Sequence, residues 1–355
     1  MARAAGLRTG HLLLGADHLG PYPWRKQPSA KAMEKACELV RACVRAGYSK
    51  IHLDASMACA DDQEPLPDHE VAARAAILCE VAEQTCRDSG SPFPLYVVGT
   101  EVPAPGGQAE AEGAPAVTST KQVQSSLAAF QKAFAKRGLS KAWERVVGLV
   151  VQPGVEFGDH VVFDYDHRKA RRLSAALPSR PRLVYEAHST DYQSGAALAR
   201  MVRDHFAILK LGPWLTFAFR EAIFALSSIE RELLAGKKGV NLSQVQRALE
   251  TAMLRNPVYW RPYYGGTKEE QRLARVFSYS DRCRYYWPVA SVQKEINRLL
   301  NNLSKLPLPL TLISQYLPGE YEALRQGHLE ARPAAIIHHH IRQVLRVYST
   351  ACHAD

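Results

Sequence analysis

The run Val146-Val-Gly-Leu-Val-Val151 decides the fold class, because it is apolar throughout and consists mainly of β-branched residues. The first two-thirds of the chain contains five further short apolar runs: His11–Gly15, Lys50–Leu53, Leu95–Gly99, Leu183–Tyr185 and Phe206–Leu211. Continuous apolar runs of this length are typical of strands that are covered on both faces, as strands in parallel sheets are. We therefore expect six parallel strands.

Longer segments with helical periodicity separate these runs. Apolar residues return every three or four positions in Ser29–Ala46, Asp68–Asp88 and Thr120–Arg137, which predicts helices with one buried face. Strands that alternate with helices indicate an α/β fold. The chain offers six β/α units, whereas a closed TIM barrel needs eight.

The alternation stops at about Gly236. The later segments Leu242–Leu254, Val292–Leu303 and Ala334–Tyr348 have only helical periodicity. We therefore expect two parts, a (β/α) barrel core over residues 1–235 and a helical C-terminal appendage over residues 236–355 that packs on the barrel.

Composition and charge limit the classes of function. The chain has 355 residues, of which 46% are hydrophobic and 23% charged, as in globular proteins. The net charge of +10 comes from single Lys and Arg residues spread along the chain, without a nucleic-acid motif. An anionic small substrate such as a sugar phosphate explains this charge, and we expect no nucleic-acid partner.

Cysteine usage and apolar segments predict the compartment. The seven cysteines include no Cys-x-x-Cys pair, which favours buried thiols in a reducing environment. No secretory signal is visible, and the most apolar later stretch contains Lys210, Arg220 and Glu221, so we expect no membrane span. The sequence therefore predicts a soluble cytoplasmic protein.

Ionisable and polar residues follow the predicted strands. In parallel α/β folds the ligand site forms at the carboxyl ends of the strands, so these positions are the candidates for chemistry. They are, in order, Asp17 and His18, then Asp54 and Ser56, then Glu101, then Gln152 and Glu156, then Glu186, His188, Ser189, Thr190 and Asp191, and finally Lys210 and Gly212.

Two of these residues, His18 and His188, suit a divalent metal ion together with the nearby carboxylates. Such an ion could polarise a ketose and stabilise an enediolate, with Asp17 or Glu101 transferring the proton. The alternative is that each residue only satisfies a local hydrogen bond.

The last two strand ends suggest a phosphate site. Ser189-Thr190-Asp191 supplies hydroxyl groups, and Gly212 precedes a helix whose N–H groups could bind an anion. Helix capping explains the same residues equally well. Arg282 belongs to a dense cluster of Arg and aromatic residues that could hold a phosphate or pack the appendage against the barrel.

Other motifs are weaker. The tract His338–His340 resembles a metal tract, but consecutive residues of a helix point in different directions, so we expect a solvated or partner-facing helix. The chain has neither a P-loop nor a G-x-G-x-x-G motif after a strand, so we expect no nucleotide cofactor and no kinase activity.

Several long strings resemble a known family, the Z-type subunit of D-tagatose-1,6-bisphosphate aldolase (GatZ/KbaZ). The resemblance runs from about Leu12 nearly to the C-terminus. It is carried by GADHLGP at 15–21, KIHLDASM at 50–57, GTEVP at 99–103, VQPGVEF at 151–157, YEAHSTDY at 185–192, SDR at 280–282, YYWP at 285–288 and SQYLP at 314–318.

The resemblance implies a (β/α)₈ barrel of the class II aldolase type and a set of roles. Asp17 matches the proton-transferring Asp of class II aldolases, Glu101 matches a strand-end Glu, and His18 and His188 match zinc ligands. The third zinc-ligand His appears here as Gln152 or its neighbours, which weakens a zinc site. Family members also carry about two β/α units before the Asp-His strand, so we expect either a truncated start or an open barrel.

Three functions remain open. The first is a non-catalytic subunit that supports the activity and stability of a zinc-dependent Y-type catalytic subunit in tagatose, galactitol and N-acetylgalactosamine catabolism. The second is a tagatose-6-phosphate (fructose-6-phosphate) 4-epimerase that uses Zn²⁺, Mn²⁺, Co²⁺ or Ni²⁺ and retro-aldol chemistry. The third is a carbohydrate-binding scaffold without chemistry. We favour the subunit, which could also form a homo-oligomer.

Overall fold

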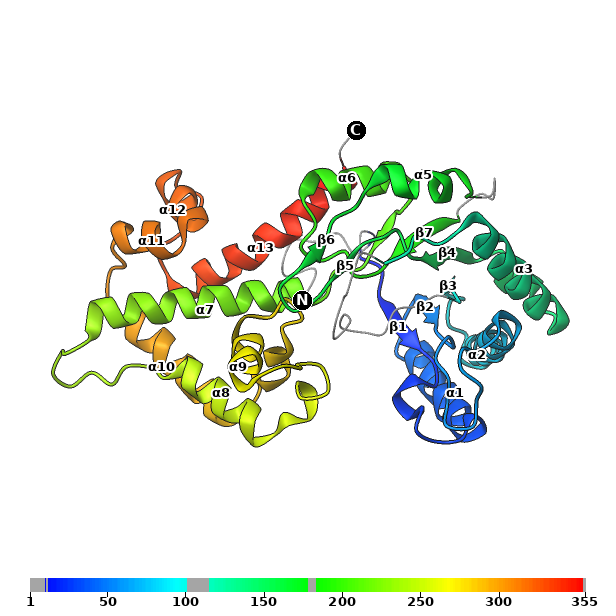
Figure 1. Ribbon diagram of the computed structural model, residues 1–355, viewed down its shortest axis with the longest axis horizontal. Helices are drawn as coiled ribbons and strands as arrows, with labels where there is room; N and C mark the ends of the chain where they lie inside the picture. Colours follow the sequence, from blue (N-terminus) through cyan, green and yellow to red (C-terminus); the bar gives the residue numbers. More distant parts are fainter. Residues whose placement is uncertain (1–9, 11, 101–114, 178–182, 354–355) are drawn as a thin grey trace.

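A six-stranded parallel sheet forms the centre of the first part of the chain in the computed structural model, which describes residues 10, 12–100, 115–177 and 183–353 (Figure 1). The strand order is β1-β2-β3-β4-β7-β8. The strands are β1 (Gly15–Leu19), β2 (Lys50–Leu53), β3 (Leu95–Val98), β4 (Val146–Val151), β7 (Val184–Ala187) and β8 (Ile208–Leu209). The sheet is curled like half of a barrel. The predicted α/β fold and its six parallel strands are confirmed.

The first strand differs from its prediction. The run was expected at His11–Gly15, but β1 begins at Gly15, so Asp17 and His18 lie within the strand and not after it. The reason is an irregular pairing with β2, whose register shifts between Ala16 and Leu19, and His18 has a φ of +54°. Such an irregularity lets a strand re-aim polar side chains that apolar patterning does not reveal.

A glycine allows the end of β1 to approach β2 closely. A Cβ atom added at Gly20 would lie 1.5 Å from the backbone oxygen of Asp54. No side chain fits there without moving the backbone, so Gly20 fixes how closely these two strand ends approach.

Helices follow the strands and pack against the sheet (Figure 1). They are α1 (Ser29–Arg45), α2 (Asp68–Ser89), α3 (Thr120–Lys136), the short α4 (Ser140–Trp143), α5 (His167–Ala175), α6 (Gly195–Arg203) and α7 (Pro213–Leu234). The three predicted helices form within one residue of their expected ends. Their periodic apolar residues are buried in the first core, as Ala36 and Val40 of α1 show.

A small antiparallel hairpin interrupts the alternation after β4. It consists of β5 (Glu156–Phe157) and β6 (Val162–Phe163). The sequence does not predict this hairpin, because strands of two residues are too short to show a period.

Residues after 236 form helices, as predicted. These are α8 (Val245–Arg255), α9 (Lys268–Phe277), α10 (Ala290–Leu303), α11 (Leu310–Tyr316), α12 (Pro318–Arg325) and α13 (Pro333–Cys352), with short 3₁₀ turns that include Arg282–Tyr286. A second hydrophobic core joins them to α7. The division at residue 236 stays a prediction, because α13 contributes Ile336 to this second core and Val344 and Tyr348 to the first.

Helix α13 runs back from the appendage to the sheet (Figure 1), where it packs on α6 and α7. The expectation of a solvated or partner-facing helix is therefore wrong for much of its length. His339 is buried, whereas His338 is exposed, so consecutive histidines do point in different directions.

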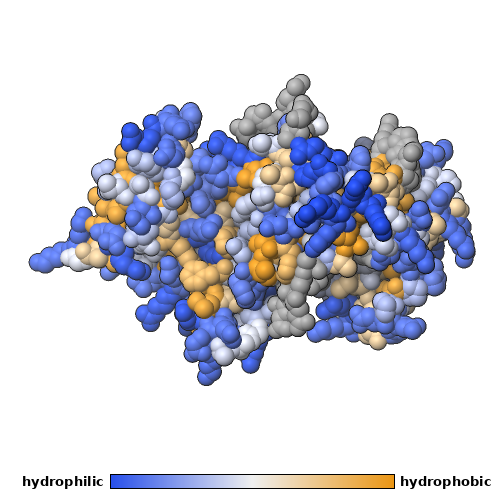
Figure 2. Space-filling model, turned by 45° about the horizontal axis from the view of Figure 1, so that its top comes forward, coloured by the Kyte–Doolittle hydropathy of each residue, from blue (hydrophilic) through white to orange (hydrophobic). Residues whose placement is uncertain are grey.

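The surface is largely hydrophilic on the face shown in Figure 2, with hydrophobic areas separated by polar ones. Long hydrophilic side chains project where α5 lies, a helix that contains Arg168, Lys169, Arg171 and Arg172. All seven cysteines are unpaired, and four of them are buried. Within the described residues, no helix combines the length and the apolar character needed to cross a membrane.

Candidate functional site

Charged and imidazole side chains gather on one face of the sheet near the ends of β1, β2, β7 and β8. We call them the strand-end cluster: Asp17, His18, Lys50, His52, Asp54, Glu186, His188 and Lys210. Residues two apart in a strand point to the same face. Lys50 and His52 therefore share this face, while Ile51 and Leu53 belong to the hydrophobic core.

Three imidazole rings meet in the cluster. The ring centroids of His18 and His52 lie 5.2 Å apart, those of His18 and His188 also 5.2 Å, and those of His52 and His188 5.6 Å. Burial lowers the pKa of His52 to about 3, and burial also lowers the pKa of His188 although Glu186 opposes that shift. Both imidazoles are therefore neutral near pH 7, which is the form that binds metal ions.

The two buried carboxylates stay ionised. Burial disfavours the charged form of Asp54, but hydrogen bonds from His18 and Ser56 outweigh it and lower the pKa of Asp54 to about 2. Burial likewise opposes ionisation of Glu186, whose pKa is nevertheless lowered by His188, at 2.9 Å, and by nearby cations. The cluster thus combines neutral imidazoles with ionised carboxylates.

Two lysines bridge the carboxylates. Nζ of Lys50 lies 3.0 Å from Oδ1 of Asp17 and 3.2 Å from Oε2 of Glu186. Nζ of Lys210 lies 2.9 Å from Oδ1 of Asp17 and 3.3 Å from Oε1 of Glu186. Burial opposes the ionisation of Asp17, but the two ammonium groups outweigh it and lower the pKa of its carboxyl. The cluster therefore contains charges of both signs in contact, three carboxylates and two ammonium groups.

One set of three residues can hold a metal ion in the part of the chain that the structure describes. His52, Glu186 and His188 are all buried, and each offers a ligand atom within 4.8 Å of the other two. Two neutral imidazoles and a carboxylate suit Zn²⁺ and similar ions and leave a coordination position open. Nδ1 of His52 accepts a hydrogen bond from the backbone N–H of His18 at 3.4 Å, and Nε2 is buried without a hydrogen-bond partner in the described structure. In the neutral ring this contact leaves the proton on Nε2, so a metal ion bound at Nε2 would have to replace that proton.

A family model decides the identity of the chain. The model described as "D-tagatose-1,6-bisphosphate aldolase subunit GatZ/KbaZ-like" matches residues 1–353. The chain belongs to this family. The resemblance inferred from the sequence is confirmed, and the protein is a tagatose-bisphosphate aldolase subunit of the GatZ/KbaZ type.

Two solved structures are similar to this GatZ/KbaZ-like subunit. A "probable tagatose 6 phosphate kinase" from Sinorhizobium meliloti has 41% sequence identity and a TM-score of 0.88, over 99% of this chain and 85% of that chain. A fructuronate-tagaturonate epimerase from Cohnella laeviribosi has 14% identity and a TM-score of 0.40, over 88% of this chain and 66% of that chain. The second likeness is too weak to indicate function.

The structure brings six of the thirteen predicted site residues of the GatZ/KbaZ-like subunit together. Asp17, His18, Asp54, His188 and Lys210 all belong to the strand-end cluster, and Ser56 adjoins it through Asp54. Glu101, the other predicted proton-transfer residue, lies outside the described residues.

Gln152 is engaged elsewhere. Its Oε1 accepts hydrogen bonds from the backbone N–H groups of Gly154, at 2.8 Å, and Val155, at 3.1 Å. Nδ1 of His18, the other predicted ligand, lies 2.8 Å from Oδ2 of Asp54. Of the three predicted metal ligands, only His188 is in the set that the structure brings within ligand distance.

The predicted phosphate site shows capping contacts. Oδ1 of Asp191 accepts hydrogen bonds from the N–H groups of Gly212 and Trp214, both at 2.9 Å, at the start of α7. The hydroxyl of Thr190 donates a hydrogen bond to the backbone oxygen of Lys210 at 2.7 Å. The side chain of Ser189 forms a hydrogen bond with the carboxylate of Glu156. Because a carboxylate already occupies this helix N-terminus, a phosphate would have to share it.

Arg282 packs among aromatic residues of the appendage. Its guanidinium carbon lies 3.0 Å from the ring centroid of Tyr263, and it donates to the backbone oxygen of Tyr259 at 3.3 Å. Both contacts lie within the appendage, so a phosphate role for Arg282 and packing of the appendage against the barrel both stay predictions.

Lys50 and His52 are not among the residues predicted from the sequence, and Glu186 is predicted only as a strand-end residue without an assigned role. The sequence does contain a signal for two of them. The segment Lys50–Leu53 has the pattern of a buried strand, and yet its alternate positions, Lys50 and His52, are basic. Residues two apart in a strand point to the same face of the sheet. Two basic side chains on one face of a buried strand are unusual for a hydrophobic core, so they indicate a site. Glu186 was expected just after its strand but lies inside β7.

Proposed function

We propose that this protein is the supporting subunit of a class II D-tagatose-1,6-bisphosphate aldolase and works beside a Y-type catalytic subunit in the cytoplasm. The match of residues 1–353 to the subunit family carries this proposal. We also propose that the six-stranded sheet belongs to a (β/α)₈ barrel architecture. Its curl and strand order support this, because neighbouring strands of such barrels are parallel and follow the chain order.

In this proposal the strand-end cluster binds the sugar phosphate. The ammonium groups of Lys50 and Lys210 can attract a phosphate, and the ionised carboxylate of Asp17 between them can accept a proton. His52, Glu186 and His188 would hold a divalent ion, which supplies polarisation of a ketose carbonyl when bound. The lysines that contact Glu186 oppose a cation there, which favours weak metal binding and a supporting role.

The test measures cleavage of tagatose 1,6-bisphosphate by a purified Y-type subunit with and without this chain. We expect the chain to raise the aldolase rate and the thermal stability of the Y-type subunit, and to co-elute with it. An unchanged rate and separate elution, from a chain shown to be folded, would reject the supporting role.

The second candidate is a metal-dependent sugar-phosphate 4-epimerase. The buried set of His52, Glu186 and His188 favours it, because a pure scaffold does not need neutral imidazoles beside an ionised carboxylate. The chain alone is incubated with fructose 6-phosphate and Zn²⁺, Mn²⁺, Co²⁺ or Ni²⁺. Formation of tagatose 6-phosphate that His188→Ala abolishes and His338→Ala retains would establish the epimerase.

A further inference from the structure

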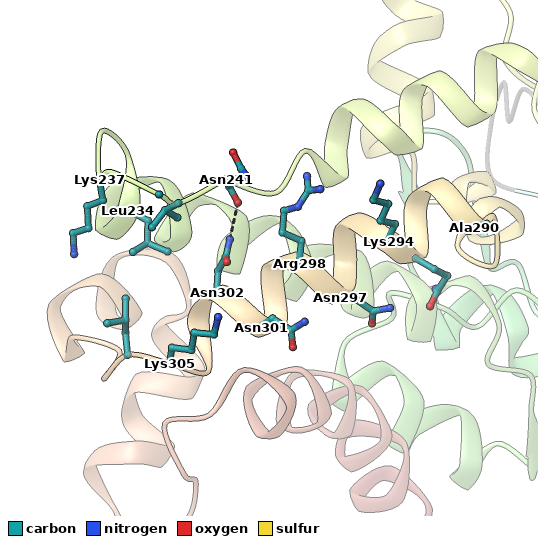
Figure 3. Close-up of a pocket in the computed structure, with 14 residues that line it drawn as sticks. Leu234, Lys237, Asn241, Ala290, Lys294, Asn297, Arg298, Asn301, Asn302 and Lys305 are labelled. Carbon is teal, nitrogen blue, oxygen red and sulfur yellow. Dashed lines mark hydrogen bonds between the residues drawn. The ribbon is translucent and has the colours of Figure 1, made fainter.

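A groove separate from the strand-end cluster lies between the C-terminal end of α7, the segment 235–244 and α10 (Figure 3). Its volume is about 940 Å³. The lining contains no carboxylate and four cationic side chains, those of Lys237, Lys294, Arg298 and Lys305. The absence of carboxylates from the lining sets the groove apart from the strand-end cluster, where charges of both signs are in contact.

Most of the positive charge in the groove is unpaired. Arg298 forms an ion pair with Glu295 at 2.8 Å. Lys237, Lys294 and Lys305 have no ion pair with any residue that the structure describes, and all three are exposed. Three free ammonium groups around one concave surface attract an anionic ligand.

The charges are arranged along a line. Lys294, Arg298 and Lys305 are four and seven residues apart, and the spacing places them along one side of α10 and its C-terminal end (Figure 3). At 1.5 Å per residue, Lys294 and the last residue of α10, Leu303, are separated by about 14 Å along the helix axis, and Lys305 follows two residues later. One phosphate group is too small to contact both ends, whereas an elongated acidic chain can.

A hydrogen bond joins the two sides of the groove, and part of the lining is apolar. The side-chain amide of Asn302 donates to the backbone oxygen of Asn241 at 2.9 Å and to Oε1 of Glu230 at 2.6 Å, which ties α10 to the segment opposite (Figure 3). Leu234, Val240 and Leu306 supply apolar lining between the lysines. A ligand with both acidic and apolar groups therefore complements this surface.

We propose that this groove binds an acidic amphipathic helix of a partner protein. The carboxylates of the helix pair with Lys237, Lys294 and Lys305, and its apolar residues rest on the apolar part of the lining. Recognition of an amphipathic helix by a groove with apolar contacts is a common mode of protein association. The charges give the complex its orientation and its dependence on salt.

The experiment uses the full chain and a fluorescein-labelled peptide of Glu, Leu and Ala in amphipathic helical order. A length of about 16 residues spans about 24 Å, enough to cover the groove. We expect fluorescence anisotropy to show binding that weakens with salt. The double substitution Lys294→Glu and Lys305→Glu should weaken binding about tenfold or more.

The matched control reverses two charges on another basic helix. Lys169→Glu and Arg172→Glu on α5 change the net charge by the same amount, and both residues are exposed. This variant should bind the peptide like the wild type, and a peptide of the same composition in scrambled order should bind more weakly. Equal losses in the two variants, no binding by the wild type, or tighter binding of a single-stranded RNA oligonucleotide would each overturn the proposal.

Discussion

Two clusters of histidine and carboxylate in the described structure differ in what their imidazoles can do. The strand-end cluster lies at the sheet. The second, which we call the helix cluster, joins α7, α12 and α13 and consists of Glu221, Glu320, His339 and His340. Both contain buried histidines close to carboxylates.

The difference lies in the protonation of the histidines. Burial opposes the charge of His340, but Glu221 and Glu320, at 3.3 and 3.2 Å, outweigh it and raise its pKa to about 9. Its two nitrogens therefore hold protons and donate to carboxylates. His52 has a pKa of about 3, and its Nε2 has no partner in the described structure. The helix cluster is thus a structural ion pair, while the strand-end cluster keeps a neutral imidazole whose Nε2 is free to contact a ligand.

The largest difference between the clusters is expected in the free energy of unfolding, when each cluster loses its central carboxylate. Glu186→Gln leaves the ammonium groups of Lys50 and Lys210 with only Asp17 as a carboxylate partner, and breaking a buried pair costs about 3–5 kcal/mol. Glu320→Gln leaves His340 paired with Glu221, so we expect about 1–2 kcal/mol. Urea unfolding at pH 7 measures both. Equal losses would mean that the two clusters contribute alike to stability.

Metal binding should separate the clusters next. At a free Zn²⁺ concentration of about 100 times Kd, a metal site stabilises the folded protein by about 2.7 kcal/mol. We expect Zn²⁺ to raise the Tm of the wild type and of His340→Ala, but not of His188→Ala, and EDTA to reverse the rise. A rise that His340→Ala removes and His188→Ala retains would place the metal in the helix cluster.

The periodic elements of the fold could be predicted from the sequence, and the irregular ones could not. Strands such as β4 are apolar on both faces, so their amino-acid composition is enough to predict them. β1 contains Asp17 and His18 because an irregular register turns them away from the core, and apolar patterning cannot show this. Helix α13 begins in the second hydrophobic core and ends in the first, beside the sheet. Its path depends on tertiary contacts of residues such as Tyr348, which periodicity does not reveal.

The candidate site could be predicted only in part, because position in the chain shows which residues end a strand but not which residues neighbouring strands bring together. Residues that end a strand, such as His188 and Lys210, were found from their position. His52 and Glu186 lie inside strands, and their role follows from the neighbouring strands that place them side by side. Asp191 was found as a polar strand-end residue, but only the structure shows that its carboxylate caps α7.

The pH dependence of the helix cluster gives a smaller effect. Because the pKa of His340 is raised from 6.5 to about 9 on folding, its stabilisation is fully present below about pH 6.5 and is lost as the pH rises through 9. We expect His340→Gln to cost about 1 kcal/mol at pH 6, since solvent screens the pair with half-exposed Glu221, and almost nothing at pH 10. The difference in urea midpoint at the two pH values measures this. The same cost at both would show that packing and not charge stabilises His340.

The smallest effect tests whether the clusters are coupled through α13. This helix carries His340 in its first half and Tyr348 near its end. The Tyr348 hydroxyl donates to the backbone oxygen of Thr190 at 2.7 Å, and Thr190 is two residues from His188. Tyr348→Phe removes this bond and should cost about 1 kcal/mol. In a double-mutant cycle with His340→Gln, followed by urea unfolding at pH 6, we expect the two costs to add within about 0.5 kcal/mol, because the residues lie two helical turns apart and share no partner. A larger coupling would mean that α13 transmits the protonation of His340 to the strand-end cluster, and the two clusters would then act as one unit.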